Sequence, residues 1–250
     1  MVNPFASTKG VLGFNREEHA LQVAALVTAS GADLGAVIDP SGEQLLLVDD
    51  EGLVLSFDQL LFVFLDLVCD RLLGDTVALP VTVSRAAAKI VESRGYKVLW
   101  TKTSAAALME EADHPAVGFA ANLEGGIILP GFLPAFDAAA GLLKMLDLLS
   151  ARGAKLSDLV AAAPAVHLVH EEVITPWEQK GTVMRTMVEQ TQGREVDLID
   201  GIKVHHETGW VLVLPDPSEP VTHIWAEGDS AADARTLAQE YARRIRQMLR

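Results

Sequence analysis

The sequence predicts an α/β fold with mixed, mostly parallel sheets and helices on both faces, followed by a C-terminal α+β unit with an antiparallel sheet. Half of the 250 residues are hydrophobic, which is enough to form the cores of two or three small domains. Between residues 76 and 162, strand-like runs alternate with helical patterns, as in parallel sheets covered on both faces. After residue 165, several strand-like runs follow one another, which indicates antiparallel pairing.

The first unit, residues 1–74, consists of a helix, two strands and a second helix. Asn15 can cap the first helix, and a Pro-Ser-Gly turn separates the strands. The second helix is apolar nearly all round, so we expect it to be buried. The elements are predicted at 16–30 (helix), 36–38 and 45–48 (strands) and 58–73 (helix). Because a mononucleotide-binding-type domain has more elements than these, we expect the rest to be missing or to be supplied by preceding sequence. Met1 is then a cut into a longer chain or an added start codon.

The second and third units, residues 75–164 and 165–250, are separated near Pro164. In the second unit, Ser84 can cap a helix that Gly95 ends, and in the third unit Ser230 can cap the last helix. The second unit has predicted strands at 76–83, 97–101, 116–120 and 127–129 and helices at 85–94, 104–111, 135–151 and 155–162. The third has strands at 167–174, 195–198, 202–206, 209–214 and 221–226 and helices at 177–190 and 231–248.

Charge and cysteine content exclude several classes of function. The net charge of −14 and a pI near 4.8 argue against a nucleic-acid or membrane-surface partner. The single cysteine, Cys69, lies in an apolar helical pattern and is interpreted as a buried core thiol. No internal disulfide is possible, and the apolar run 60–68 is too short to span a bilayer. The first residues show no signal-peptide pattern, so we expect none. We therefore expect a cytoplasmic protein.

An acidic turn lies between the two strands of the first unit. Asp39 and Glu43 flank it, and carboxylates in a tight turn can hold a hard cation through oxygen ligands. The alternative interpretation is a plain hairpin with an acidic surface loop, since such loops are common. The residues and their spacing leave both interpretations open.

The same stretch resembles the metal-binding loop of the phosphohexomutases, the phosphomannomutase and phosphoglucomutase family, whose pattern is ADLGxxxDGDxDR. Residues 32–35 match its ADLG, and Asp39 takes the position of the first metal ligand. Ser41 and Glu43 stand where the second and third Asp belong, and Gln44 replaces the Arg. The resemblance implies Mg²⁺ as a cofactor, with Asp39 and Glu43 as remnants of its site. Because Ser41 supplies no carboxylate, we expect no tightly bound metal or other cofactor.

The order of the three units is similar to the end of domain 2, domain 3 and domain 4 of this family, over nearly the whole chain. No serine lies in a setting like the family's catalytic phosphoserine motif. The family's K-x-[ST]-R keeps Ser84 and Arg85 but loses the Lys, and its T-G-H is replaced by Thr-Ser-Ala at 103–105. The sugar-specificity loop G-E-x-S-G-H corresponds to residues 121–126, where Gly125 survives and the Glu, Ser and His are replaced.

The family's domain 4 phosphate loop, R-P-S-[GN]-T-E-P, corresponds to residues 214–220. Leu214 replaces the phosphate-clamping Arg, Asp216 adds a charge that repels phosphate, and Pro217 lacks a backbone N–H donor. Ser218 keeps a hydroxyl in place of Thr. The positions that retain the family's residue are Pro215, Glu219 and Pro220.

Three segments resemble a narrower branch, the mutase-like half fused behind a sugar nucleotidyltransferase of the mannose-1-phosphate guanylyltransferase type. They lie at 3–11, 124–130 and 175–185. This resemblance implies an upstream nucleotidyltransferase domain as a partner and a regulatory, binding or oligomerising role in carbohydrate metabolism, with a homo-oligomer as a further possibility. The alternative is a phosphohexomutase that is active only with an N-terminal phosphoserine domain.

We expect the chain alone to have no mutase activity and no catalytic residue, and to bind hexose phosphates weakly in a cleft between the second and third units. The remnant sugar and phosphate residues implied by the resemblance are Arg85, Lys102, Glu124, Gly125, Ser218 and Glu219. A different enzyme site around His205, His206 and Glu207 is a weaker option. Neighbouring strand residues point to opposite faces, so the two histidines are a poor pair of metal ligands.

Overall fold

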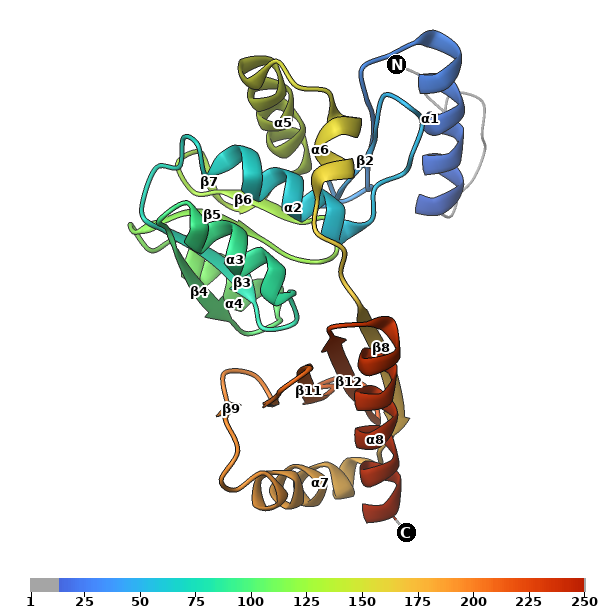
Figure 1. Ribbon diagram of the computed structural model, residues 1–250, viewed down its shortest axis with the longest axis vertical. Helices are drawn as coiled ribbons and strands as arrows, with labels where there is room; N and C mark the ends of the chain where they lie inside the picture. Colours follow the sequence, from blue (N-terminus) through green and yellow to red (C-terminus); the bar gives the residue numbers. More distant parts are fainter. Residues whose placement is uncertain (1–13, 250) are drawn as a thin grey trace.

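The computed structural model describes residues 14–249, arranged as three units in chain order (Figure 1). The first two units lie together, and the third is joined to them by the segment that follows α6 (Leu156–Ala162). The resemblance noted at residues 3–11 lies outside the described residues. Among those described, no helix is both long and apolar enough to cross a membrane.

The first unit begins with α1 (Arg16–Ser30), which the side chain of Asn15 caps by accepting from Glu18 N–H. The strands β1 (Gly35–Ile38) and β2 (Leu45–Val48) pair antiparallel and form a two-stranded sheet. The helix and hairpin follow the predicted pattern because a local cap and a local turn specify them.

The second helix, α2 (Phe57–Val68), is buried as predicted, but it ends five residues earlier than the sequence pattern suggests. Ser56 and Gln59 form a capping box at its start. After Cys69 the chain turns outward, and Leu73 is 79% exposed. The apolar pattern beyond residue 68 therefore does not continue a core-facing helix.

The second unit contains a five-stranded sheet in the order β4-β3-β5-β6-β7. The first three strands pair in parallel and the last two antiparallel, which confirms the predicted mixed sheet. Its elements are β3 (Thr76–Pro80), α3 (Arg85–Ser93), β4 (Lys97–Thr101), α4 (Ala105–Ala112), β5 (Val117–Ala121), β6 (Ile127–Leu129), β7 (Leu133–Phe136), α5 (Ala138–Arg152) and α6. The sequence analysis missed β7. Pro134 is tolerated in it because β7 is an edge strand.

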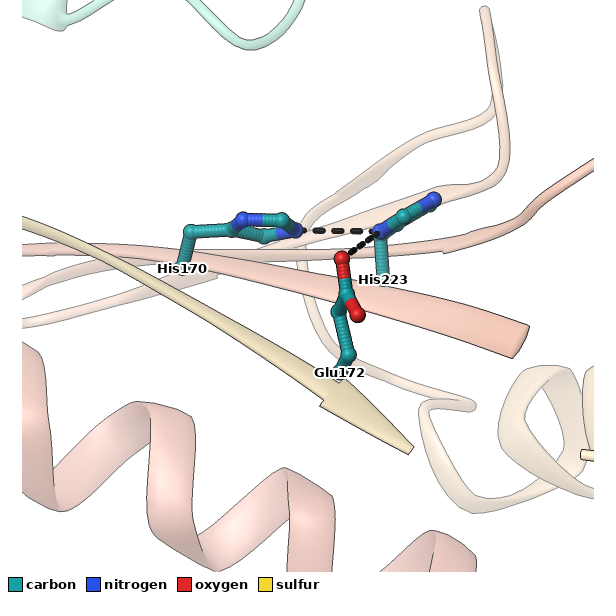
Figure 2. Close-up of side chains that lie close together, drawn as sticks. All are labelled: His170, Glu172 and His223. Carbon is teal, nitrogen blue, oxygen red and sulfur yellow. Dashed lines mark hydrogen bonds and ion pairs between the residues drawn. The ribbon is translucent and has the colours of Figure 1, made fainter. Parts of the chain in front are cut away.

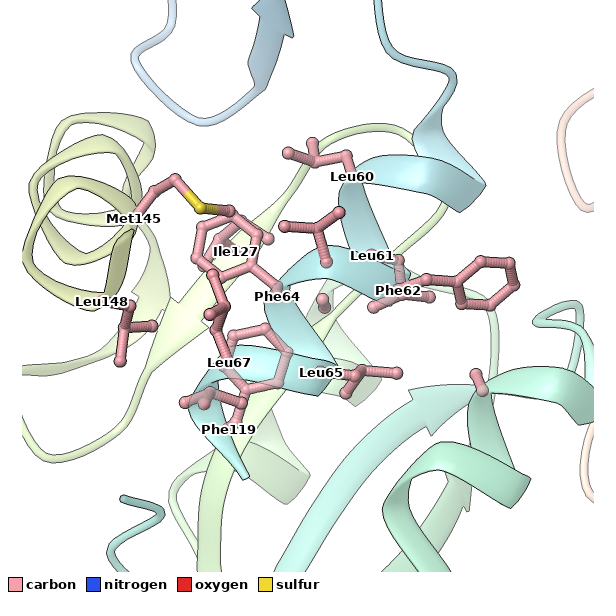
Figure 3. Packing of buried hydrophobic residues seen from close by; sticks show 14 of the residues in the cluster. Leu60, Leu61, Phe62, Phe64, Leu65, Leu67, Phe119, Ile127, Met145 and Leu148 are labelled. Carbon is pink, nitrogen blue, oxygen red and sulfur yellow. The ribbon is translucent and has the colours of Figure 1, made fainter. Parts of the chain in front are cut away.

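Helices cover both faces of this sheet. On one face, α2 packs with α3, α5 and α6, and its Phe64 stacks on Phe119 of β5 (Figure 3). On the other face, Leu108 of α4 packs against Ala120 and Ile128. Although α2 precedes the predicted boundary at residue 74, its buried side chains thus belong to the core of the second unit.

The third unit is an antiparallel sheet, as predicted, and its strands lie in the order β8-β12-β11-β10-β9. Its elements are β8 (Leu168–Ile174), α7 (Trp177–Gln190), β9 (Val196–Asp197), β10 (Ile202–His206), β11 (Gly209–Pro215), β12 (Val221–Gly228) and α8 (Ala231–Met248). One face packs against α8 through Tyr241 and Ile245. On the other face, Trp210 and Leu212 pack with Val81 of the second unit.

Candidate functional site

A pocket of about 460 Å³ lies between the second and third units. Its walls include the loops that follow the carboxyl ends of β3, β4 and β5, where open α/β sheets bind their ligands. The opposite wall comes from β8, β12 and the β11–β12 loop. The polar side chains that line it are Thr82, Lys102, Thr103, Ser104, Asn122, Glu124, His170, Asp200, Asp216 and His223.

The wall after β4 carries an exposed Lys102 and a bridge to the third unit. Thr103 donates to Asp200 Oδ2 from both its backbone N–H, at 2.8 Å, and its hydroxyl, at 2.7 Å. Ser104 caps α4 by accepting from Ala107 N–H. The loop that replaces the family's T-G-H therefore holds the two walls of the pocket together.

The sugar-loop positions place Glu124 in the pocket, where its carboxylate lies 3.5 Å from the side-chain nitrogen of Gln44. Gly125 has a φ of 86°, and a Cβ there would clash with the carbonyl oxygen of Leu45. The backbone N–H of Leu45 also donates to Gly125 O at 2.8 Å. Gly125 is thus required for the close contact between this loop and the first unit.

The β11–β12 loop is closed by its own carboxylate. Asp216 Oδ1 accepts from the backbone N–H groups of Ser218, at 2.6 Å, and Glu219, at 2.7 Å, while Oδ2 lies 3.0 Å from Nε2 of His223. The hydrogen bond from His223 and those two backbone donors lower the pKa of Asp216 to about 2. Lys180 binds the carbonyl oxygens of Asp216 and Glu219. An ionised carboxylate therefore occupies the donors that an external anion would use.

Arg85 does not line this pocket, although the sequence analysis places it near the sugar and phosphate. It lies in a second hollow of about 260 Å³, where Nε is 3.2 Å from Glu227 and the guanidinium also pairs with Asp229. Glu227 additionally accepts from the indole N–H of Trp210 at 3.0 Å. Arg85 thus links the second and third units, a role that depends on residues more than 140 positions away.

Lys203 forms a second link between these units. Its ammonium group donates to Val81 O at 2.8 Å and lies 3.9 Å from the ring centre of Trp210. Burial lowers the pKa of Lys203 to about 8, although the charges of Asp197 and Glu227 act in the opposite direction.

The predicted residues Ser218 and Glu219 lie at the exposed outer side of the β11–β12 loop.

The predicted metal loop fits Mg²⁺ poorly. Asp39 Oδ1 accepts from the N–H groups of Glu43, at 2.9 Å, and Gln44, at 2.7 Å, and Oδ2 accepts from the N–H and hydroxyl of Ser41. Burial raises the pKa of Asp39, but the hydrogen bonds from Ser41, Gln44 and Glu43 outweigh it and lower the pKa overall. Glu43 is exposed. The loop uses its first carboxylate to hold its own backbone, and Ser41 adds no charge for a cation.

A cluster that the sequence analysis missed lies on the third unit's face of the pocket. His170, Glu172 and His223 each present a possible metal-ligand atom within 4.8 Å of the others (Figure 2). Burial and the charge of His223 lower the pKa of His170, while Glu172 raises it. The only sequence signal is the His-x-Glu spacing, which puts two side chains on one face of a strand.

The histidines at 205 and 206 point to opposite faces of β10, as predicted. His205 lies 2.7 Å from Asp197, whereas His206 lies 3.0 Å from the hydroxyl of Tyr241 on α8. They therefore do not form a shared site.

Comparisons with known proteins agree with this architecture. Residues 56–167 match the family described as phosphoglucomutase/phosphomannomutase, alpha/beta/alpha domain III. The chain is 33% identical over 232 residues to a probable phosphoglucosamine mutase from Methanopyrus kandleri, covering 88% of this chain and 49% of the relative. It is 27% identical over 224 residues to a phosphoglucomutase/phosphomannomutase from Thermococcus kodakarensis, covering 88% and 48%. The chain therefore spans about half the length of these relatives.

Among solved structures, a phosphoglucomutase/phosphomannomutase family protein from Burkholderia thailandensis superposes with a TM-score of 0.77 at 24% identity, covering 91% of this chain and 49% of the other. At this identity the likeness shows the fold alone, and that fold is the α/β architecture of the phosphohexomutases. Residues 56–167 thus match the phosphoglucomutase/phosphomannomutase domain III, and the sequence matches support a relation of the chain to the phosphohexomutase superfamily.

Proposed function

We propose that this chain supplies the sugar-facing half of a phosphohexomutase-type protein. It holds a hexose phosphate in the pocket between the second and third units, and phosphoryl transfer requires a phosphoserine-bearing domain that the described residues do not contain. The names of the sequence relatives, phosphoglucosamine mutase and phosphoglucomutase/phosphomannomutase, support this class of ligand.

The observation that carries the proposal is the meeting of the loops after β3, β4 and β5 with the β11–β12 loop in one pocket. Its volume of about 460 Å³ lies within the usual range for small-ligand sites. Lys102, Ser104 and Glu124 offer donors and acceptors of the kind that sugar hydroxyls require.

The charge of the pocket sets the expected strength of binding. Lys102 is a cation among its lining residues, whereas Glu124, Asp200 and Asp216 carry carboxylates. Nearby carboxylates repel a phosphate dianion, and partial desolvation strengthens the repulsion. We therefore expect hexose phosphates to bind with a Kd on the order of 1 mM, equivalent to about 4 kcal/mol.

Ligand-observed NMR with glucosamine 1-phosphate and mannose 1-phosphate tests the proposal. We expect saturable, weak binding that Lys102→Ala abolishes and Lys97→Ala leaves unchanged. Lys97 is a matched control because it is an exposed lysine at the opposite end of β4, paired with Asp75. The absence of saturable binding in the wild type, or equal losses in both variants, would overturn the proposal.

A second candidate function follows from the closed loops at Asp39 and Asp216. A region whose metal and phosphate loops are occupied by its own carboxylates suits a non-catalytic role, such as a regulatory or oligomerising module beside a nucleotidyltransferase of the mannose-1-phosphate guanylyltransferase type. Light scattering measures self-association, and a guanylyltransferase assay with and without this chain measures regulation. A monomer without effect on that assay would eliminate this candidate.

A further inference from the structure

The sheet face that borders the pocket brings together three side chains from two strands (Figure 2). His170 and Glu172 are two positions apart on β8, so they point to the same face. β12 pairs with β8 in a register that puts His223 directly opposite Glu172 and Trp225 opposite His170. Directly paired and diagonal neighbours in a sheet lie within contact distance, so the register alone makes the three side chains converge.

The distances between these side chains are those of a chelating group. His170 Nε2 lies 3.0 Å from His223 Nδ1, which lies 3.6 Å from Glu172 Oε1. An ion held at about 2.0–2.1 Å by two imidazoles in tetrahedral geometry keeps their nitrogens roughly 3.3 Å apart. The observed separation of the two imidazole nitrogens is therefore close to that of a chelating pair.

The orientation of His223 is fixed by a carboxylate behind it. Nε2 of His223 lies 3.0 Å from Asp216 Oδ2. This contact turns Nε2 toward the carboxylate and leaves Nδ1 facing His170 and Glu172. Carboxylate–histidine pairs of this kind orient metal ligands and raise their basicity.

His170 is held in place by a different contact. Its ring stacks on Trp225 with the centroids 4.0 Å apart and an interplanar angle of 11°. This contact leaves Nε2 of His170 facing His223. Two pre-oriented imidazoles and one carboxylate form a donor set that suits Zn²⁺ and its neighbours in the transition series better than Mg²⁺, which prefers oxygen.

We propose that His170 Nε2, His223 Nδ1 and the Glu172 carboxylate bind one divalent transition-metal ion of the Zn²⁺ type. Three protein ligands leave a fourth position, and because His170 and His223 line the pocket, that position faces it. The ion places positive charge beside the β11–β12 loop, where, among the described residues, Leu214 stands in the lining and no arginine does. An anionic ligand in the pocket can then coordinate the ion directly.

A competition titration of tag-free protein with Zn²⁺ against a chromophoric chelator tests this site without any sugar ligand. We expect one ion per chain. Asp216→Asn removes the negative charge of an outer-shell partner, and changes to such partners typically weaken metal binding about 10–100-fold. His170→Ala and His223→Ala each remove a ligand, so we expect larger losses from them than from Asp216→Asn.

His114→Ala is the matched control, because His114 is an exposed histidine in the second unit, outside the cluster. Glu172→Gln serves as a second ligand variant, since Glu172 is exposed and its replacement leaves the core intact. Co²⁺ bound in place of Zn²⁺ should show the intense visible absorption of a four-coordinate ion, and His223→Ala should remove this absorption. Equal affinities in the wild type and the His170→Ala/His223→Ala double variant, or an equal loss in His114→Ala, would refute the site.

Discussion

Lys203 makes the stability of the junction between the second and third units depend on pH. Burial lowers the pKa of Lys203 from 10.5 to about 8 in the folded protein. Between these two values the unfolded chain holds a proton that the folded chain has released, so unfolding takes up a proton and stability rises with pH. The difference between the two pKa values lowers the free energy of unfolding by about 3 kcal/mol at pH 7, and this loss disappears as the pH approaches 10.5.

Replacement of Lys203 by methionine isolates this contribution, because all other titrating groups are common to both proteins. We expect the free energy of unfolding of the wild type, minus that of Lys203→Met, to rise by about 3 kcal/mol between pH 7 and pH 10.5. Urea unfolding at stepped pH measures it, with tryptophan fluorescence as a local probe because the ammonium lies beside the rings of Trp100 and Trp210. A difference that stays constant with pH would refute this prediction, because it would mean that Lys203 has the same pKa in the folded and unfolded states.

Four further outcomes are expected. Phe64→Ala should lower the free energy of unfolding by about 3–5 kcal/mol in urea titrations, because the ring is fully buried; a loss below about 1 kcal/mol would contradict the core assignment. Gly125→Ala should lower the free energy of unfolding more than Gly95→Ala, because both glycines have a positive φ but only a Cβ at Gly125 would also clash with a backbone carbonyl. Equal losses of stability in the two variants would show that this close contact does not require Gly125. Calorimetric titration should show no tight Mg²⁺ site at Asp39 and Glu43, and micromolar binding would show that the loop still works. A coupled mutase assay with mannose 1-phosphate or glucose 1-phosphate, a bisphosphate activator and Mg²⁺ should stay at background, and turnover by the purified chain would disprove it.

Local signals in the sequence were sufficient for most elements. Helices α1, α7 and α8 have the predicted bounds, and Asn15 and Ser230 cap α1 and α8 as expected. A cap satisfies backbone N–H groups within three residues, so the necessary information lies in one short segment. The end of α2 and the strand β7 differ from expectation. The strand β7 forms an edge of the sheet by pairing with β6, a contact that no local pattern encodes.

The sequence likewise predicted some residues of the candidate site and misplaced others. The sequence pattern and its resemblance to the phosphohexomutases led to Lys102, Glu124 and Asp216, all of which line the pocket. Arg85 follows the same pattern, yet it pairs with Glu227 in a different hollow, a contact that no local pattern encodes.

What the sequence alone determined is therefore the order of the three units and the class of each sheet, since these follow from periodicity, caps and turns. Its resemblance to the phosphohexomutases indicated the loops that border the cleft. Only the tertiary structure decided which side chains meet. His170 and His223 are 53 positions apart and lie within 3.0 Å because β8 and β12 pair in one particular register. A shift of one residue in that register would turn one of these strands' side chains to the other face of the sheet, so the cluster exists only once the whole sheet has formed.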